Sequence, residues 1–158
     1  DAAYRAALAA DADGYTALSY ADFLIEQGRA ADALARLAGE PRSDAVLLRL
    51  AIAGRRSNAP DAARDARELR ERMVLASLRP DAGVTHAREQ AMFALWIEGD
   101  APRAVALARA DVRLQREPLD VLVYAQAARA AGDASASREV DMLRKEMGLH
   151  DHRLDTLP

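Results

Sequence analysis

Two stretches of the chain share one pattern, which reads LIEQGRAADAL at residues 24–34 and LWIEGDAPRAV at residues 95–105. In each stretch an apolar helical segment leads to a glycine, which is followed by a charged residue, an alanine, a pair of residues of which one is charged, a second alanine and an aliphatic residue. A glycine just past the end of a helix can adopt the left-handed backbone conformation that ends the helix. The pattern therefore predicts two helices joined by a tight turn.

The same turn recurs along the chain at a regular distance. Gly132 follows Gly99 by 33 residues, and a period of this length is typical of stacked helical hairpins. An alanine lies five residues after Gly28 and after Gly99, and Ser137 stands at the same distance after Gly132. Small residues at this spacing allow two helix backbones to approach closely.

The residues after these glycines are suited to begin the next helix. Asp100 and Asp133 follow their glycines directly, and an aspartate at this place can accept hydrogen bonds from the first turn of the helix. Pro102 suits a first turn, where its missing N–H is not needed. We expect Asp100 and Asp133 to be helix caps.

Composition narrows the class of protein further. The chain has 158 residues, about one domain's worth, and 38 of them are alanine, whereas aromatic residues make up only 4%. Alanine has the highest helix propensity and adds little bulk, which favours closely packed helices. The net charge of −3 and the single lysine, Lys145, argue against nucleic acid as a ligand, including for an RNA-binding helical repeat. The absence of cysteine excludes disulfides, thiolate metal sites and a cysteine nucleophile.

No pattern of catalytic or metal-binding residues is complete. The chain has no glycine-rich phosphate loop and no nucleophile elbow. His86 and Glu89 are spaced to share one helix face, but no further ligand completes a metal site. His150, Asp151 and His152 form the densest group of metal-ligand types, in a tail that we expect to dock on the last helix. We predict no enzyme activity, no metal and no cofactor.

The glycine-to-alanine spacing, carried by Gly28 with Ala33 and by Gly99 with Ala104, resembles that of the tetratricopeptide repeat family. The resemblance implies an all-α fold, a right-handed α-α superhelix of about four antiparallel helical hairpins. In the second unit the sequence Ser57–Pro60 replaces the glycine turn, and several aromatic positions of the family pattern hold alanine or leucine. The implied repeat domain covers residues 1–148, with units of about 14–42, 43–80, 83–117 and 118–148, and residues 149–158 form a C-terminal tail.

In this family the first helix of each unit lines a concave groove that binds a peptide or a partner helix. The resemblance therefore implies a protein-interaction scaffold. The groove candidates are Arg49, Arg55, Arg56, His86, Glu89, Gln90, Phe93, Trp96, Gln126 and Arg129. Three arginines near one helix end would suit an acidic partner segment or a terminal carboxylate, or would simply be a solvated helix end. Phe93 and Trp96 would be either binding anchors or core residues.

Two other functions remain open at this point. The chain could be the helical or regulatory subunit of a larger enzyme or sensor assembly, or a structural homodimer in which helix faces pair. No apolar run reaches the length of a membrane span, so we expect no membrane insertion and a soluble protein, cytoplasmic or periplasmic. Because the chain begins at Asp1, further repeats or a processed segment before it stay open as well.

Overall fold

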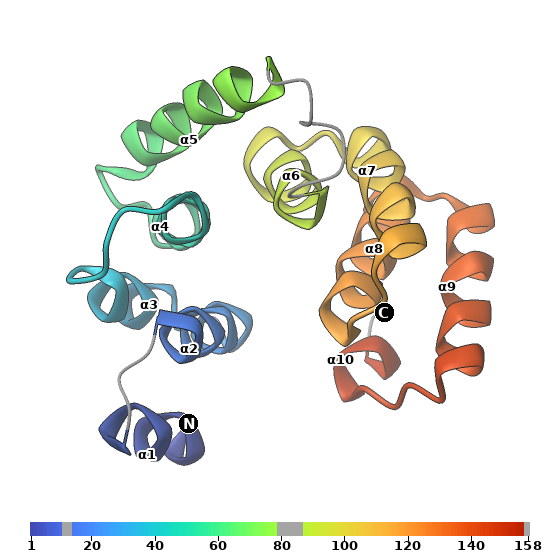
Figure 1. The fold of residues 1–158 in the computed structure, drawn as a ribbon, viewed down its shortest axis with the longest axis horizontal. Coiled ribbons are helices and arrows are strands. Elements are labelled where there is room, and N and C mark those ends of the chain that lie inside the picture. The colour runs from blue at the N-terminus through green and yellow to red at the C-terminus, as the bar shows by residue number, and fades with distance from the viewer. Residues whose placement is uncertain (11–13, 79–86, 157–158) are drawn as a thin grey trace. The chain divides into compact units, whose positions relative to one another are not determined.

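The computed structural model describes residues 1–10, 14–78 and 87–156, and every regular element in these ranges is helical (Figure 1). The all-α prediction is therefore confirmed. The elements are α1 (Ala2–Ala10), α2 (Gly14–Glu26), α3 (Ala30–Leu37), α4 (Asp44–Ser57), α5 (Ala62–Ser77), α6 (Ala87–Phe93), the π-helical turn η1 (Ala94–Glu98), α7 (Ala101–Leu114), α8 (Pro118–Ala131), α9 (Ala134–Met147) and α10 (His152–Asp155).

Consecutive helices pack together as adjacent pairs within two compact units, residues 1–83 and residues 84–158. In unit 1, α2 packs against α3 and α4 packs against α5, while α1 rests on α2. The two hairpins meet where α4 contacts both α3 and α2. The first helix of each hairpin is thus in contact with the first helix of the other.

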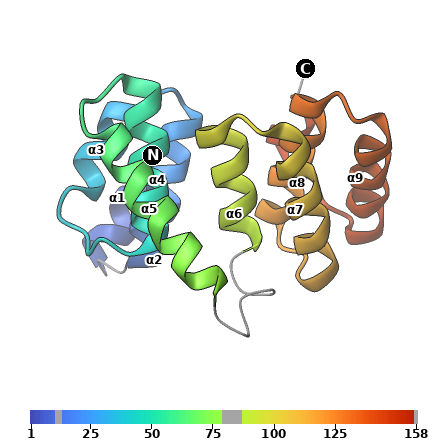
Figure 2. The same ribbon diagram turned by 90° about the horizontal axis from the view of Figure 1, so that it is seen from above.

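Unit 2 repeats this arrangement. The helix formed by α6 and η1 packs against α7, and α8 packs against α9. Helix α8 also contacts both α7 and α6, so the two first helices again touch (Figure 2). In unit 2 one further element, α10, rests on α8 after the second hairpin.

The predicted turns end their helices through a left-handed residue. Gly28 and Gly99 have φ angles of +73° and +72°, a region that disfavours side chains with a Cβ. Asn58 takes the same conformation, with φ +55°, between α4 and α5, where the sequence has no glycine. Asparagine tolerates this region better than most residues. The second hairpin therefore closes like the others despite its different turn sequence.

One glycine is required by close packing rather than by backbone conformation. Gly54 lies within α4, and a Cβ added there would stand 2.9 Å from the Cβ of Ala62 on α5. That distance is too short for two carbon atoms. The absence of a side chain at this position allows α4 and α5 to approach each other.

The predicted helix caps are confirmed. The side chain of Asp100 accepts a hydrogen bond from the backbone N–H of Arg103, at 3.0 Å. The side chain of Asp133 accepts bonds from the backbone N–H groups of Ser135 and Ala136, at 2.9 and 3.0 Å. Each aspartate satisfies N–H groups that the helix itself cannot pair.

Small residues fill the helix contacts in both units, as the alanine content indicates. Ala21 and Ala33 are fully buried between α2 and α3, and Ala104 is fully buried on α7. The larger core side chains include Leu24 in unit 1 and Tyr124 in unit 2, both with 1% exposure or less. No helix of the described ranges is both long and apolar enough to cross a bilayer.

Candidate interaction surfaces

An internal ion pair connects the two first helices of unit 1. The guanidinium group of Arg49 on α4 donates two hydrogen bonds to the carboxylate of Asp22 on α2, Nε to Oδ1 at 3.0 Å and Nη2 to Oδ2 at 2.8 Å. Arg49 also donates to the backbone oxygen of Ala45 and is only 5% exposed. We predicted Arg49 for partner binding near a helix end, but it lies within α4 and its charge is satisfied inside the unit.

The other two arginines of the predicted group lie at the C-terminal end of α4. Arg55 and Arg56 are both exposed. Arg56 donates a hydrogen bond to the backbone oxygen of Ile25, at 3.0 Å, and so connects α4 to the last turn of α2. Burial of part of this side chain lowers the pKa of Arg56, and the nearby carboxylate of Glu26 opposes that effect. The accessible basic surface of these helices therefore consists of two arginines rather than three.

Helix α1, which lies outside the predicted repeats, packs on α2 and borders a pocket there. The rings of Tyr4 on α1 and Tyr20 on α2 stack with centroids 5.3 Å apart. Between α1 and α2 lies a pocket of about 410 Å³, bordered by Tyr4, the exposed Tyr15, Thr16 and Ser19. The predicted repeat units do not include this helix, although the spacing of its tyrosine and alanines is typical of a helix.

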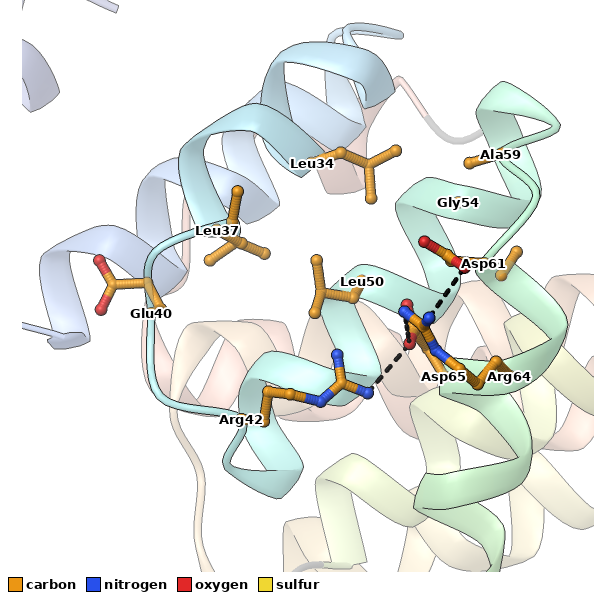
Figure 3. A pocket seen from close by; sticks show the side chains of 12 residues that line it. Leu34, Leu37, Glu40, Arg42, Leu50, Gly54, Ala59, Asp61, Arg64 and Asp65 are labelled. Carbon is orange, nitrogen blue, oxygen red and sulfur yellow. Dashed lines mark hydrogen bonds and ion pairs between the residues drawn. The ribbon is translucent and has the colours of Figure 1, made fainter.

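A second pocket of unit 1 lies between α3, α4 and α5 and has a volume of about 330 Å³ (Figure 3). Leu34, Leu37 and Leu50 supply apolar side chains to it. At its edge the carboxylate of Asp65 pairs with Arg42 at 3.0 Å and with Arg64 at 3.4 Å. Arg42 also pairs with Glu68, and Arg64 with Asp61, so both arginines are paired within the unit. The predicted groove lies on first helices only, whereas this pocket is formed largely by second helices and the loop after α3.

In unit 2 the predicted groove residues have different degrees of exposure. Glu89, Gln90 and Trp96 are half-buried. Phe93 is 3% exposed, which places its ring in the core and resolves the choice between anchor and core for this residue. Trp96 lies in the π-helical turn η1, an element that often occurs at functional sites. His86 lies outside the described residues.

Two further groove candidates lie on α8. The side-chain oxygen of Gln126 is buried and accepts no hydrogen bond from the described residues, although the residue as a whole is half-buried. A buried acceptor without a donor costs about 1–3 kcal/mol. Arg129 is exposed and borders a pocket between α8 and α9. Arg129 is thus accessible, whereas the side-chain oxygen of Gln126 is not.

A buried cluster of charges joins α6, α7 and α8. The guanidinium of Arg88 on α6 pairs with the carboxylate of Asp120 on α8, whose side chain is fully buried, and with Glu117 at 2.5 Å. Asp111 on α7 is 3% exposed and accepts a hydrogen bond from Gln115 at 3.1 Å. Burial, and next the negative charge of Asp120, raise the pKa of Asp111 to about 6. The cluster therefore holds two buried carboxyl groups, Asp111 and Asp120, together with the exposed Glu117 and one cation.

A second polar cluster, at Tyr124, lies between α7, α8 and α9. The Tyr124 hydroxyl donates to the carboxylate of Glu139 at 2.6 Å and accepts from Arg109 Nε at 2.9 Å. Burial, and then the Glu139 carboxylate, raise the pKa of Tyr124 to about 12. The hydroxyl therefore keeps its proton at neutral pH. Since each polar group has a partner within the unit, this cluster stabilises the second hairpin.

Comparisons with protein-family models, with curated proteins and with solved structures found no significant match. Within residues 1–10, 14–78 and 87–156 no three side chains of histidine, aspartate or glutamate are placed to hold a metal ion. His150 and His152 are both exposed, and the tail that carries them reaches α8 through α10.

Proposed function

We propose that this protein is a non-catalytic scaffold of the tetratricopeptide-repeat type, which binds a peptide or a partner helix on the surface of its first helices. In this proposal the four hairpins, α2–α3, α4–α5, α6–α7 and α8–α9, are the repeat units of a right-handed superhelix. The observation that carries the proposal is the repeated contact pattern: in each unit the first helix of the second hairpin packs on both helices of the first.

The exposed groups of α2 and α4 favour an acidic partner segment. Arg55 and Arg56 present two guanidinium groups at one end, and guanidinium groups bind carboxylates through paired hydrogen bonds. At the other end of α2, Tyr15 is 81% exposed beside the pocket under α1. A tyrosine in this setting offers a large contact area with a polar tip. We therefore propose a peptide with acidic residues toward Arg55 and an apolar residue toward Tyr15.

A binding selection tests this proposal on the full chain. The probe is a library of short synthetic peptides with free carboxyl termini, selected on the immobilised protein. We expect selected peptides to be rich in aspartate and glutamate. The double substitution Arg55→Glu and Arg56→Glu should weaken their binding at least about tenfold, a loss of about 1.4 kcal/mol. Arg138→Glu, at an exposed position of α9, is the matched control and should leave the affinity unchanged.

The proposal would fail if no peptide is selected, or if binding is the same for the double variant and the control. Trp96→Ala offers a separate test in unit 2. The peptides to test are those that protect the fluorescence of Trp96 in the unmodified chain from quenching. If half-buried Trp96 contacts these peptides, Trp96→Ala weakens their binding. Unchanged binding of such peptides would remove Trp96 from the proposed site.

One observation favours a second candidate function, a structural homodimer. Val74, Leu75 and Leu78 near the end of α5 are 56%, 67% and 76% exposed. Exposed apolar residues gathered on one helix end often mark a protein contact. Light scattering over a range of concentrations distinguishes the two candidates: a dimer that Leu75→Glu dissociates supports the homodimer, and a monomer at all concentrations contradicts it.

A further inference from the structure

The last described helix occupies a groove on the second hairpin of unit 2. Helix α10 rests on α8, and its residue Leu154 is only 6% exposed. A carboxylate oxygen of Asp155 pairs with the guanidinium of Arg144 on α9. The tail therefore contacts both helices of this hairpin, with one apolar side chain inserted and one acidic side chain paired.

The tail fills this groove only in part. A pocket of about 240 Å³ remains beside Leu154. It is lined by Ala125 and Arg129 of α8, by Ser137, Val140, Asp141 and Arg144 of α9, and by Leu154 itself. A volume of this size accommodates a further apolar side chain. The groove is thus larger than the helix that occupies it.

The packing of the earlier helices indicates the length of helix that the surface of the α8–α9 hairpin can accommodate. In unit 1, α4 lies against both helices of the preceding hairpin, and in unit 2, α8 does the same. Each of these helices has 14 residues. Helix α10 follows the last hairpin in the same order but has 4 residues. A longer helix would cover surface that α10 leaves open.

The charges around the groove select the kind of helix that would bind. Arg129 and Arg144 face one acidic lining residue, Asp141, so the lining has an excess of positive charge. The tail matches this lining with an acidic residue directly after its leucine. The tail thus provides an example of the sequence that fits, a leucine followed by an acidic residue on a short helix.

We propose that this groove is a docking site for a leucine-bearing acidic helix of a partner protein, and that α10 is an intramolecular occupant which the partner displaces. The proposal does not rest on the binding surface of α2 and α4, because its residues lie in unit 2. A tethered segment competes at a high effective concentration, so the tail would hold the site closed until a longer or better-matched helix arrives.

The experiment compares the unmodified full chain with variants of it, and uses a peptide as a stand-in for the partner helix. The peptide has the sequence of residues 149–158 and carries a fluorescent label for anisotropy titration. Leu154→Ala and, separately, Asp155→Arg weaken the attachment of the tail of the protein. Asp155 is exposed, so the second variant leaves the core intact. We expect both variants to bind the peptide at least about tenfold more tightly than the unmodified chain does, because the internal competitor is weakened.

Two matched pairs assign the binding to the groove. A peptide with the change Leu154→Ala should bind at least about tenfold more weakly than the unmodified peptide, whereas the exposed-site change Thr156→Ala should have no effect. In the Asp155→Arg protein, Ser137→Arg should block the pocket, and Ser135→Arg, also exposed on α9 but outside the lining, should not. The proposal would be overturned if the Leu154→Ala and Asp155→Arg proteins bind the peptide no more tightly than the unmodified chain, or if neither variant binds it. It would also be overturned if Ser137→Arg does not change the binding.

Discussion

Within each unit an ion pair connects the first helices of the two hairpins. The two ion pairs have opposite polarity. In unit 1 the acid, Asp22, lies on the earlier helix and the base, Arg49, on the later one. In unit 2 the base, Arg88, lies on the earlier helix and the acid, Asp120, on the later one. The helix order is the same in both units, so the packing does not depend on which helix carries which charge.

The two ion pairs differ in their surroundings. Asp22 retains 20% side-chain exposure, whereas the side chain of Asp120 is fully buried and has a second carboxyl group, Asp111, as a neighbour. Water can therefore solvate Asp22 if its partner is lost, but it cannot reach Asp120. The comparison teaches that the same helix contact can be either tolerant or sensitive, according to the burial of the acid.

The largest expected effect comes from removing the cation in unit 2. Arg88→Leu leaves two buried carboxyl groups without a positive charge and should lower the free energy of unfolding of unit 2 by about 3–5 kcal/mol. Trp96, the single tryptophan, lies in unit 2, so its fluorescence during urea denaturation reports on this unit. Arg49→Leu, followed by hydrogen exchange of α2 and α4, should cost less, about 1–3 kcal/mol. A larger loss for Arg49→Leu would reverse the comparison.

The second prediction concerns pH, which should affect unit 2 through Asp111. Its raised pKa of about 6 means that the folded unit keeps a proton which the unfolded chain releases near the ordinary aspartate pKa. The contribution of this group to stability therefore falls as pH rises from the ordinary aspartate pKa to about 6, and it is lowest above about pH 6. Asp111→Asn should stabilise unit 2 by about 1–2 kcal/mol at neutral pH, less than the full shift because the site is coupled to Asp120.

This gain should shrink toward zero below about pH 4, where the group is protonated in both states. Urea denaturation followed by Trp96 fluorescence at the two pH values measures the difference. The exposed Asp141 of α9 offers a control, since Asp141→Asn should change little at either pH. A gain for Asp111→Asn that is independent of pH would show that the charge of Asp111 is not its cause.

A smaller effect is expected at the close helix contact of unit 1. Gly54→Ala places a Cβ 2.9 Å from Ala62 and should destabilise the α4–α5 hairpin by about 1–2 kcal/mol, even though alanine favours helix formation. Adding Ala62→Gly should restore part of the loss. Thermal unfolding followed by circular dichroism measures both changes. If Gly54→Ala raises the melting temperature, α4 and α5 are not in the close contact described.

The smallest effect, with the opposite sign, is expected at Gln126. Gln126→Leu removes a buried oxygen that accepts no hydrogen bond from the described residues, and should stabilise unit 2 by about 1 kcal/mol. Destabilisation by more than about 1 kcal/mol would instead indicate that the amide is needed within the fold.

The sequence predicted the helices and their turns well because their causes are local. Gly28 and Gly99 end helices through their own backbone freedom, and Asp100 and Asp133 cap helices through neighbours two or three residues away. The sequence did not predict that Arg49 is buried in an ion pair, because the partner carboxylate of Asp22 lies 27 residues earlier in the chain. Only the register of α2 against α4 brings those two side chains together.

The pockets were missed for a related reason. The pocket of Figure 3 combines leucines of α3 and α4 with charges of α5 and of the loop before α4. The pocket beside Leu154 depends on where the tail returns to α8 and α9. Neither arrangement follows from a repeat pattern, because the pattern describes hairpins one at a time. Burial of Phe93 was likewise undecided, since an aromatic residue at helical spacing suits either a core or a groove.

Hydrogen–deuterium exchange of the full chain, with and without a selected acidic peptide, tests the central claim most directly. The account predicts that the bound peptide slows exchange in α2 and α4, especially in their last turns near Glu26, Arg55 and Arg56, and leaves α3 and α5 unchanged. Protection confined to the second helices α3 and α5, or no protection at saturating peptide, would contradict the claim that the first helices form the binding surface.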